Sequence, residues 1–302
     1  MTRQDEGRKT AGKTAEKTAE RAGGRIRERI LSAVYPRRCP LCDGILSGGE
    51  PFLCRKCAGK VRFIRGPVCM KCGAPLAEQQ EYGAESREDQ ASDRGFREGQ
   101  ERGADFRKEK SSGQGCREIP LPEESAEFCP KCRAVPHAFV QGFAPFLYRG
   151  EIRQSLMRLK YGNRAEYARF FGKALAVYGQ PWLEQWNVQL LVPVPVHPSR
   201  ERRRGYNQAA EIARVLGKEI HVPVEEDGVC RVKNTKPQKE LTGRMRRRNL
   251  QGAFQVRAGT RMPARVLIVD DIFTTGATVD ELARTLYESG AQEVYAACAS
   301  MD

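Results

Sequence analysis

Long hydrophobic runs are missing from this chain of 302 residues. No apolar stretch approaches the roughly 20 residues that a membrane-spanning helix needs, so we expect no stable membrane insertion. The sequence also has no secretory signal, so we expect a cytoplasmic location, where the reducing environment disfavours disulfide bonds. Neither the Gly-x-Gly-x-x-Gly pattern of dinucleotide-binding folds nor the Gly-Lys-Ser/Thr ending of a P-loop is present. These absences argue against a membrane protein, a disulfide-stabilised secreted protein and two common nucleotide-binding loops.

Apolar residues are also scarce in two segments. The hydrophobic fraction is 40% and the mean hydropathy is −0.60, both low for a folded protein. Residues 1–24 form a charged, low-complexity basic tail, and residues 78–127 contain only Ile119 and Leu121 as aliphatic residues larger than alanine. We expect both segments to be disordered. Residues 25–36 mix arginine with apolar residues and predict a short amphipathic helix that docks on the protein rather than on a membrane.

Cysteine is abundant, by contrast, and its spacing is regular. Eight of the eleven cysteines form four Cys-x-x-Cys pairs: Cys39/Cys42, Cys54/Cys57, Cys69/Cys72 and Cys129/Cys132. Eight thiolates are the number that two tetrahedral zinc sites require. We therefore expect two structural Zn²⁺ ions in a double zinc-ribbon module formed by residues 37–77 and 128–136. The four pairs can share the ions in sequential or interleaved order. A redox role for one pair is less favoured, because no βαβ pattern surrounds it.

The most informative segment is a strand followed by two acids. Residues 266–269 are four consecutive aliphatic residues, typical of a parallel strand that is covered on both faces. Asp270 and Asp271 follow, and their carboxylates can accept hydrogen bonds from the hydroxyls of a ribose. A helical apolar pattern begins at Val279, and free amides at a helix N-terminus favour a phosphate. The residues between the acids and this pattern include Thr274, Thr275, Gly276, Ala277 and Thr278. The sequence therefore predicts a phosphosugar site.

This segment resembles the loop that binds 5-phosphoribosyl-1-pyrophosphate (PRPP) in type I phosphoribosyltransferases, in which two acids precede a Thr-Gly-x-Thr sequence. The resemblance implies PRPP as a ligand and a type I phosphoribosyltransferase domain over residues 140–302. The alternative is a surface turn between a strand and a helix, in which the acids are merely solvated.

The rest of residues 140–302 also indicates an α/β fold. A second succession of strand, loop and helix is predicted around residues 190–216, where Pro193 and Pro195 end the strand and a site loop can start. Repeated strand–loop–helix units predict a mostly parallel sheet flanked by helices. The expected elements are a strand at 143–148, helices at 152–159 and about 166–178, a strand at 190–195 and a helix through 209–216.

A longer set of residues closely resembles the ComF family of bacterial competence proteins. The set comprises Pro193-Val194-Pro195, Arg200, Arg204-Gly205-Tyr206-Asn207-Gln208, Lys236-x-Gln238-x-x-Leu241-x-x-x-x-Arg246-x-x-Asn249 and Gly252-Ala253-Phe254. The resemblance runs from about residue 30 to the C-terminus and is interrupted by the insertion. It implies a zinc module, a phosphoribosyltransferase domain with glycosyltransferase (pentosyl transfer) activity, and an association with DNA uptake and competence proteins. A homodimer is implied by analogy only.

The resemblance also implies how PRPP is held. The ribose would lie on Asp270 and Asp271, the 5′-phosphate on residues 274–278, and the diphosphate beside the loop at 193–200, with Mg²⁺ bridging its oxygens. Cationic groups would stabilise the departing diphosphate. The candidates for this role are Arg200, Arg204, Lys236 and Arg246.

Two further segments border this predicted site. The basic segment 231–249, which is poor in aliphatic residues, is expected to close over PRPP as a lid; the alternative is a solvated surface loop. Lys160 and Tyr161 are expected to lie at its edge.

The net charge of +14 is larger than the binding of one diphosphate group requires. Basic clusters at 202–204 and 244–248 favour binding of single-stranded or duplex nucleic acid, or form a basic surface without a specific partner. Three functions remain open: a Mg²⁺-dependent PRPP transferase, a PRPP-regulated adaptor that binds DNA or competence proteins, and a zinc-stabilised interaction protein with a vestigial pocket. The intact acids and threonines disfavour the third. A glutamine-hydrolysing amidotransferase is disfavoured because no nucleophilic cysteine follows Met1.

Overall fold

The computed structural model describes residues 36–47, 52–76, 127–233 and 249–302. The predicted basic tail lies outside these ranges, as do nearly all of the predicted amphipathic helix and insertion and most of the predicted lid. Within the described residues, no helix is both long enough and apolar enough to cross a membrane.

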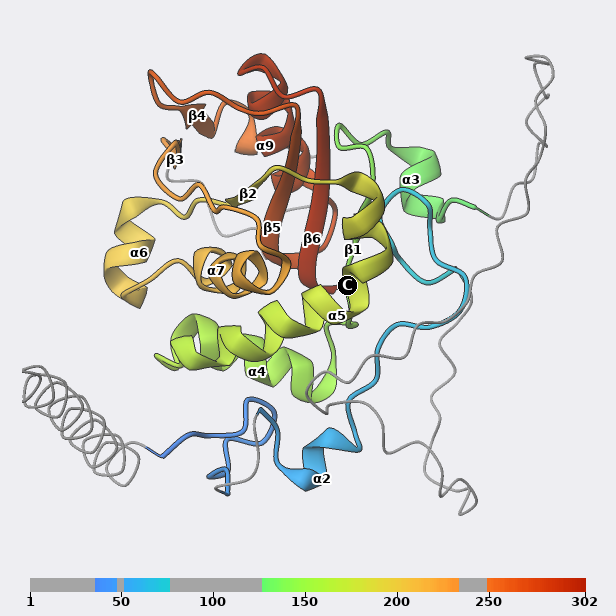
Figure 1. Cartoon of the computed structure of the whole chain (residues 1–302), viewed down its shortest axis with the longest axis vertical. Helices are drawn as coiled ribbons and strands as arrows, with labels where there is room; N and C mark the ends of the chain where they lie inside the picture. The colour runs from blue at the N-terminus through green and yellow to red at the C-terminus, as the bar shows by residue number, and fades with distance from the viewer. Residues whose placement is uncertain (1–35, 48–51, 77–126, 234–248) are drawn as a thin grey trace, which may run out of the picture.

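A four-stranded parallel sheet forms the centre of the molecule (Figure 1). Its order is β1 (Gly142–Phe143), β6 (Glu293–Met301), β5 (Arg265–Phe273) and β2 (Leu190–Pro193). Strand β5 is an interior strand, because Val266 is in register with Val294 of β6 on one side and with Leu190 of β2 on the other. Residues 266–269 are fully buried. The predicted fold class, a mostly parallel sheet flanked by helices and preceded by a cysteine-rich module, is confirmed.

Helices cover both faces of the sheet. Helices α4 (Gly150–Tyr161), α5 (Ala168–Trp186) and α7 (Gln208–Ile220) share one core with Leu267 and Val269, and η1 (Ala165–Tyr167) leads into α5. Helix α9 (Ala277–Glu288) shares the other core with Val266 and Ile268. Successive side chains of a strand point to opposite faces, so the alternation along β5 assigns each residue to one of the two cores.

Short elements complete the described chain. Helix α6 (Pro198–Arg204) lies between β2 and α7, and β3 (Val229–Arg231) pairs antiparallel with β4 (Phe254–Val256). Helices α2 (Arg55–Ala58) and α3 (Pro130–Ala134) belong to the cysteine-rich segments.

Several element boundaries differ from the prediction. Strand β5 does not end before the acids but continues to Phe273, because its ladder with β6 extends to the pair Phe273–Met301. Helix α5 runs eight residues beyond the predicted end and contains Pro181, since Leu183 and Trp186 are buried in the core. The predicted strand at 143–148 is reduced to β1 and a single bridge between Leu147 and Met301. The segment after Pro195, predicted as a loop, contains α6.

Gly172 sets how closely α5 and α7 approach. A Cβ atom at this position would lie 2.6 Å from Val215 Cβ and 2.9 Å from the carbonyl oxygen of Ile212. We expect Gly172→Ala to lower the free energy of unfolding by about 1–3 kcal/mol through overpacking, which the better helix propensity of alanine, about 1 kcal/mol, only partly offsets. Chemical denaturation measures the difference. The control is Gly59→Ala, where a Cβ meets no atom within 4 Å and φ is −71°. A Gly172→Ala protein as stable as the wild type would contradict this packing.

Candidate functional site

The acid pair lies at the carboxyl end of β5, beside the end of β2. The amide of Val194 donates to the carbonyl of Val269 at 2.9 Å, which brings the buried Pro193 and Pro195 next to Asp270. The carboxylate of Asp270 accepts a hydrogen bond from the amide of Asp271 at 2.8 Å. In open α/β sheets, ligands bind at the carboxyl ends of strands. The two predicted site segments, 193–195 and 270–271, are therefore brought together.

Lys160 completes this group of charges. Its Nζ atom lies 2.8 Å from Oδ2 of Asp271, and the two side chains are 17% and 14% exposed. Burial alone would lower the pKa of Lys160, but the charge of Asp271 and their hydrogen bond outweigh burial, and the pKa is raised. The pKa of Asp270 is also raised, because the carboxyl is withdrawn from water and lies beside Asp271. Lys160 thus neutralises Asp271, while burial and the neighbouring carboxyl disfavour the charged form of Asp270.

The turn after β5 leads into the N-terminus of α9. Gly276 adopts a left-handed conformation with φ of 73° and caps the helix, whose first residue is Ala277. The amide of Asp280 donates to the carbonyl of Gly276 at 2.8 Å, so the amides that precede it have no acceptor within the helix. The hydroxyl oxygen of Thr275 is buried and has no hydrogen-bond partner among the described residues. Thr274 and Thr278 flank this turn.

The basic candidates of α6 lie near the end of α4. Arg204 stacks over the ring of Tyr161 at 5.0 Å and donates to Gln208 at 2.7 Å. The pKa of Arg200 is lowered, chiefly by burial and then by the charge of Arg204. Tyr206 donates to the carbonyl of Leu159 at 2.5 Å, which attaches the turn after α6 to α4. The remaining candidates, Lys236 and Arg246, lie outside the described residues.

Arg231 is a basic residue near the acids that the sequence analysis did not single out. Its side chain is buried, with the guanidinium 5.6 Å from the centre of the Phe254 ring. Burial and the charge of Arg200 lower its pKa to about 10, while the charge of Asp270 opposes them. In the sequence, Arg231 is the first residue of the basic segment 231–249 and was interpreted as part of a loop. The alternating pattern of a strand could have identified it, because Val229 and Arg231 both point to the buried face of β3.

The eight paired cysteines form two groups that fit tetrahedral zinc. One group is Cys39, Cys42, Cys54 and Cys57, the other is Cys69, Cys72, Cys129 and Cys132, and within each the four Sγ atoms lie within 4.8 Å of one another. Contacts of 3.7 Å between Cys42 and Cys54 and 3.8 Å between Cys72 and Cys129 match the roughly 3.8 Å edge of a tetrahedron with Zn–S bonds near 2.3 Å. The pairing is sequential, and the groups support two structural Zn²⁺ ions.

The first zinc-binding group docks on α4 and η1. Arg158 donates to the carbonyl of Leu41 at 2.9 Å, and Arg164 lies 3.6 Å from the carboxylate of Asp43. The hydroxyl of Tyr167 also donates to Asp43. Residues 41–43 are thereby joined to η1 and to α4, whose C-terminal turn carries Lys160.

The second zinc-binding group docks on the opposite side of the sheet. The amide of Gly142 in β1 donates to the carbonyl of Lys71 at 2.8 Å, and Cys69, Cys72 and Cys129 belong to the core that includes α9. The two groups therefore contact opposite layers of the fold.

Comparison with known proteins agrees with this arrangement. A family model described as a double zinc ribbon domain matches residues 30–87. Competence protein F of Haemophilus influenzae is 37% identical over 108 residues, which cover 35% of this chain and 47% of that protein. The DNA utilization protein YhgH of Escherichia coli K12 is 30% identical over 173 residues, covering 56% of this chain and 76% of the relative. The chain belongs to the ComF family. Competence protein ComFC of Streptococcus pneumoniae is 27% identical to this ComF-family chain over 155 residues, which cover 50% of the chain and 64% of the relative.

Solved structures that are similar to this chain include phosphoribosyltransferases. The purine phosphoribosyltransferase of Pyrococcus horikoshii is 20% identical, with a TM-score of 0.26, and covers 45% of this chain and 71% of that one. The hypoxanthine phosphoribosyltransferase of Trypanosoma cruzi is 16% identical, with a TM-score of 0.29. The match covers 44% of this chain and 64% of that one.

The two cysteine groups predict the effect of single substitutions on zinc content. We expect Cys54→Ser and Cys129→Ser each to reduce bound zinc from about two ions to about one per chain, because each removes a ligand from a different group. Elemental analysis of the purified protein measures the ratio. Cys230→Ser is the control, since this thiol lies outside both groups and contacts the carbonyl of Gln255. Loss of both ions from either single variant would contradict the expectation that the two groups bind zinc independently.

The raised pKa of Asp270 predicts a pH-dependent gain in stability for Asp270→Asn. The folded state holds the proton of Asp270 more tightly than the unfolded chain, so wild-type stability falls as pH rises from about 3.9, the unfolded pKa, through the raised folded pKa. Asparagine does not titrate, so the variant does not lose stability in this way as the pH rises. We expect the melting temperature of the variant to exceed that of the wild type at pH 8, with a difference that shrinks toward pH 4. Asp227→Asn, at an exposed position, controls for the loss of one charge. A pH-independent difference would contradict the raised pKa.

Proposed function

We propose that this ComF-family protein binds PRPP and transfers its phosphoribosyl group to an acceptor in a Mg²⁺-dependent reaction. The ribose hydroxyls bind to Asp270 and Asp271, the 5′-phosphate to residues 274–278, and the diphosphate near segment 193–200. An adaptor that binds PRPP as a regulatory ligand, without catalysis, is the second candidate.

The observation that carries the proposal is the buried hydroxyl of Thr275. A buried polar group without a partner is costly, so one that persists in a folded protein needs an explanation, and a bound ligand is one such explanation. This hydroxyl lies in the turn that opens α9, where the helix N-terminus and the helix dipole favour an anion. A phosphate bound here would accept hydrogen bonds from the hydroxyl and the amides together.

The electrostatics of the acid pair support a ribose and a cation above it. Two adjacent carboxylates repel the phosphates of PRPP, but they can accept hydrogen bonds from the 2′ and 3′ hydroxyls. Their oxygens are also the ligand type that Mg²⁺ prefers, so Asp270 and Asp271 would share a Mg²⁺ ion that arrives with the diphosphate and offsets its charge. The raised pKa of Asp270 means that its carboxylate form is disfavoured in the absence of a nearby cation. A Mg²⁺ ion beside it would favour the carboxylate form, which is consistent with this role.

Cationic side chains beside the acids support stabilisation of the departing diphosphate. The charges of both Arg200 and Asp270 act on Arg231, so this guanidinium lies near the acid pair. Lys160 is held at Asp271 by their ion pair and can stay charged while the diphosphate leaves. Lys236 and Arg246 remain sequence predictions for the same task.

The names of the relatives favour a biological role connected with DNA. One relative is called a DNA utilization protein and two are called competence proteins. The basic turn at 202–204 of α6, with its exposed Arg202 and Arg203, offers a surface that can contact nucleic-acid phosphates. We propose that PRPP chemistry or PRPP binding serves this DNA-related role.

The Thr275 hydroxyl gives a sharp test of PRPP binding. We expect Thr275→Val, which keeps the shape of the side chain, to weaken binding of Mg²⁺-PRPP about tenfold in calorimetric titration, because a hydrogen bond to a charged phosphate is lost. The matched control is Thr285→Val, which removes a hydroxyl from α9 that donates to the Glu281 carbonyl, away from the turn. Equal affinities for the two variants would contradict the phosphate site.

A second measurement separates the two candidate functions. Release of diphosphate from PRPP that depends on an added nucleophile supports the transferase, and tight binding without release across an acceptor screen supports the adaptor. A wild-type protein that is folded and zinc-loaded but does not bind PRPP would contradict both. The Asp270→Asn/Asp271→Asn double variant, checked for folding, identifies the ribose site in either case.

A further inference from the structure

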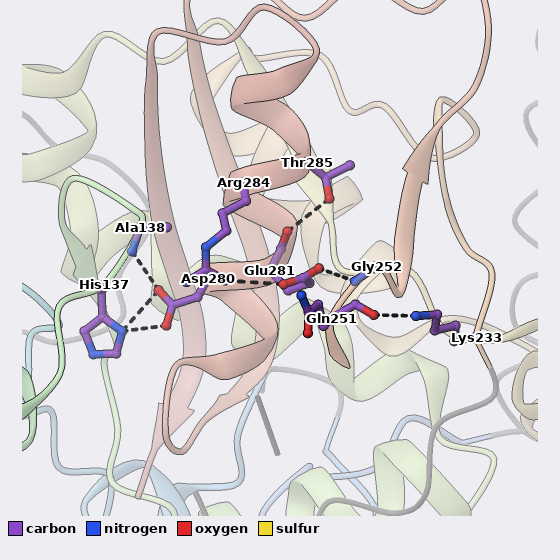
Figure 2. Close-up of polar contacts among 9 residues, drawn as sticks. All are labelled: His137, Ala138, Lys233, Gln251, Gly252, Asp280, Glu281, Arg284 and Thr285. Carbon is purple, nitrogen blue, oxygen red and sulfur yellow. Dashed lines mark hydrogen bonds and ion pairs between the residues drawn. The ribbon is translucent and has the colours of Figure 1, made fainter. Parts of the chain in front are cut away.

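His137 connects the segment that leaves the second zinc-binding group to the first turn of α9. Its Nδ1 atom lies 2.9 Å and 3.1 Å from the two carboxylate oxygens of Asp280, and the amide of Ala138 donates to the same carboxylate at 2.9 Å (Figure 2). The side chains of His137 and Asp280 are only 3% and 1% exposed. A buried carboxylate needs such partners, so the contact fixes the imidazole ring firmly.

The ring of His137 packs against the backbone of Gly276. A Cβ atom added to Gly276 would lie 2.5 Å from Cε1 and 2.8 Å from Nδ1 of the imidazole. The rings of Phe139 and Phe273 lie 5.0 Å and 5.9 Å from it and enclose it on other sides. His137 therefore occupies the space that a side chain at Gly276 would need, directly against the turn that follows Thr275.

Asp280 acts on the same turn from two directions. Its backbone amide donates to the carbonyl of Gly276 at 2.8 Å, the first hydrogen bond of α9, while its side chain holds His137 against the Cα atom of Gly276. The carbonyl and Cα of Gly276 are thus both restrained. The left-handed φ of 73° at this residue determines the direction of the amides that follow.

We propose that His137 is a positioning residue for the phosphate-binding turn: held by Asp280, its imidazole fixes the backbone of Gly276, so that binding of a ribose phosphate depends on the segment that leaves the second zinc-binding group. The inference rests on the proposed function, because it deepens the role of residues 274–278. It assigns no contact between His137 and the ligand.

A purely structural histidine predicts a different result. If His137 only fills the core, its removal lowers stability and weakens binding of every ligand alike. If it positions the turn, its removal weakens ligands that use the turn and spares ligands that bind at segment 193–200. Ribose 5-phosphate carries the 5′-phosphate and lacks the diphosphate. Mg²⁺-diphosphate carries the diphosphate and lacks the 5′-phosphate. The two probes therefore test the two ends of the site separately.

The chain offers a matched control on the same helical turn. Glu281 is the next residue of α9, and its carboxylate accepts from the amide of Gly252 instead of contacting His137 (Figure 2). Glu281→Gln removes one negative charge from the same part of the helix as Asp280→Asn and keeps an acceptor for Gly252. A difference between these two variants therefore reflects the contacts of Asp280 with His137 and Ala138, and not the loss of charge.

The experiment compares zinc-loaded wild type, His137→Ala, Asp280→Asn and Glu281→Gln. Asp280→Asn preserves the side-chain shape and carries the test if His137→Ala does not fold. In ligand-free protein, we expect hydrogen–deuterium exchange in residues 277–284 to be about tenfold faster in His137→Ala and Asp280→Asn than in wild type or Glu281→Gln. In calorimetric titrations, we expect affinity for ribose 5-phosphate to fall about tenfold in the first two variants while affinity for Mg²⁺-diphosphate stays unchanged.

The outcomes separate this inference from the proposed function. Equal loss of both ligands, or unchanged exchange and unchanged ribose 5-phosphate affinity, would overturn the positioning role. If the wild type binds neither probe, the proposed function fails, and the exchange measurement decides the role of His137 alone: faster exchange in the helix start supports it, and unchanged exchange overturns it.

Discussion

The ion pair between Lys160 and Asp271 joins α4 to the carboxyl end of the central strand at a distance of 2.8 Å. Two adjacent carboxylates at the end of a buried strand repel each other, and one of them needs a cation that is held in place. Lys160 meets this need because the C-terminal turn of α4 reaches the acid pair. The first zinc-binding group contacts the same helix through Arg158, so it helps to determine where the cation lies.

The two zinc-binding groups divide the support of the site between them. The first contacts α4 and η1, on the layer that delivers Lys160. The second belongs to the core of α9, on the layer that carries the turn at 274–278. Neither zinc-binding group contributes a cysteine to the acid pair or to the turn. The first group contacts α4, which carries the partner of the acid pair, and the second group contacts the core of α9, which begins at the turn. This arrangement explains how a metal module and an α/β domain can form one functional unit.

Local sequence patterns predicted much of this structure. Four aliphatic residues before Asp270 predicted the buried strand, and the spacing of eight cysteines predicted two metal groups, because both signals arise from neighbours in the chain. The contacts of Lys160 with Asp271 and of His137 with Asp280 join residues more than 100 positions apart, so no local pattern reveals them. Strand β5 includes the acids because its ladder with β6 continues past them, and this tertiary pairing outweighs the low strand propensity of aspartate. Arg231 was overlooked because β3 is only three residues long.

The contact between Gly73 and β1 also affects the solution behaviour of the sheet. A parallel sheet has two outer strands whose unpaired backbone groups can recruit a strand from another molecule. Here the outer amide of Gly142 is bonded to Lys71, and Gly73 packs so closely that a Cβ would lie 2.8 Å from the Gly142 carbonyl oxygen. On the other outer strand, Leu191 is bonded to residues 223 and 225. The knuckle that carries Lys71 and Gly73 therefore covers an outer strand of the sheet, the part of a sheet at which strands of other molecules can pair.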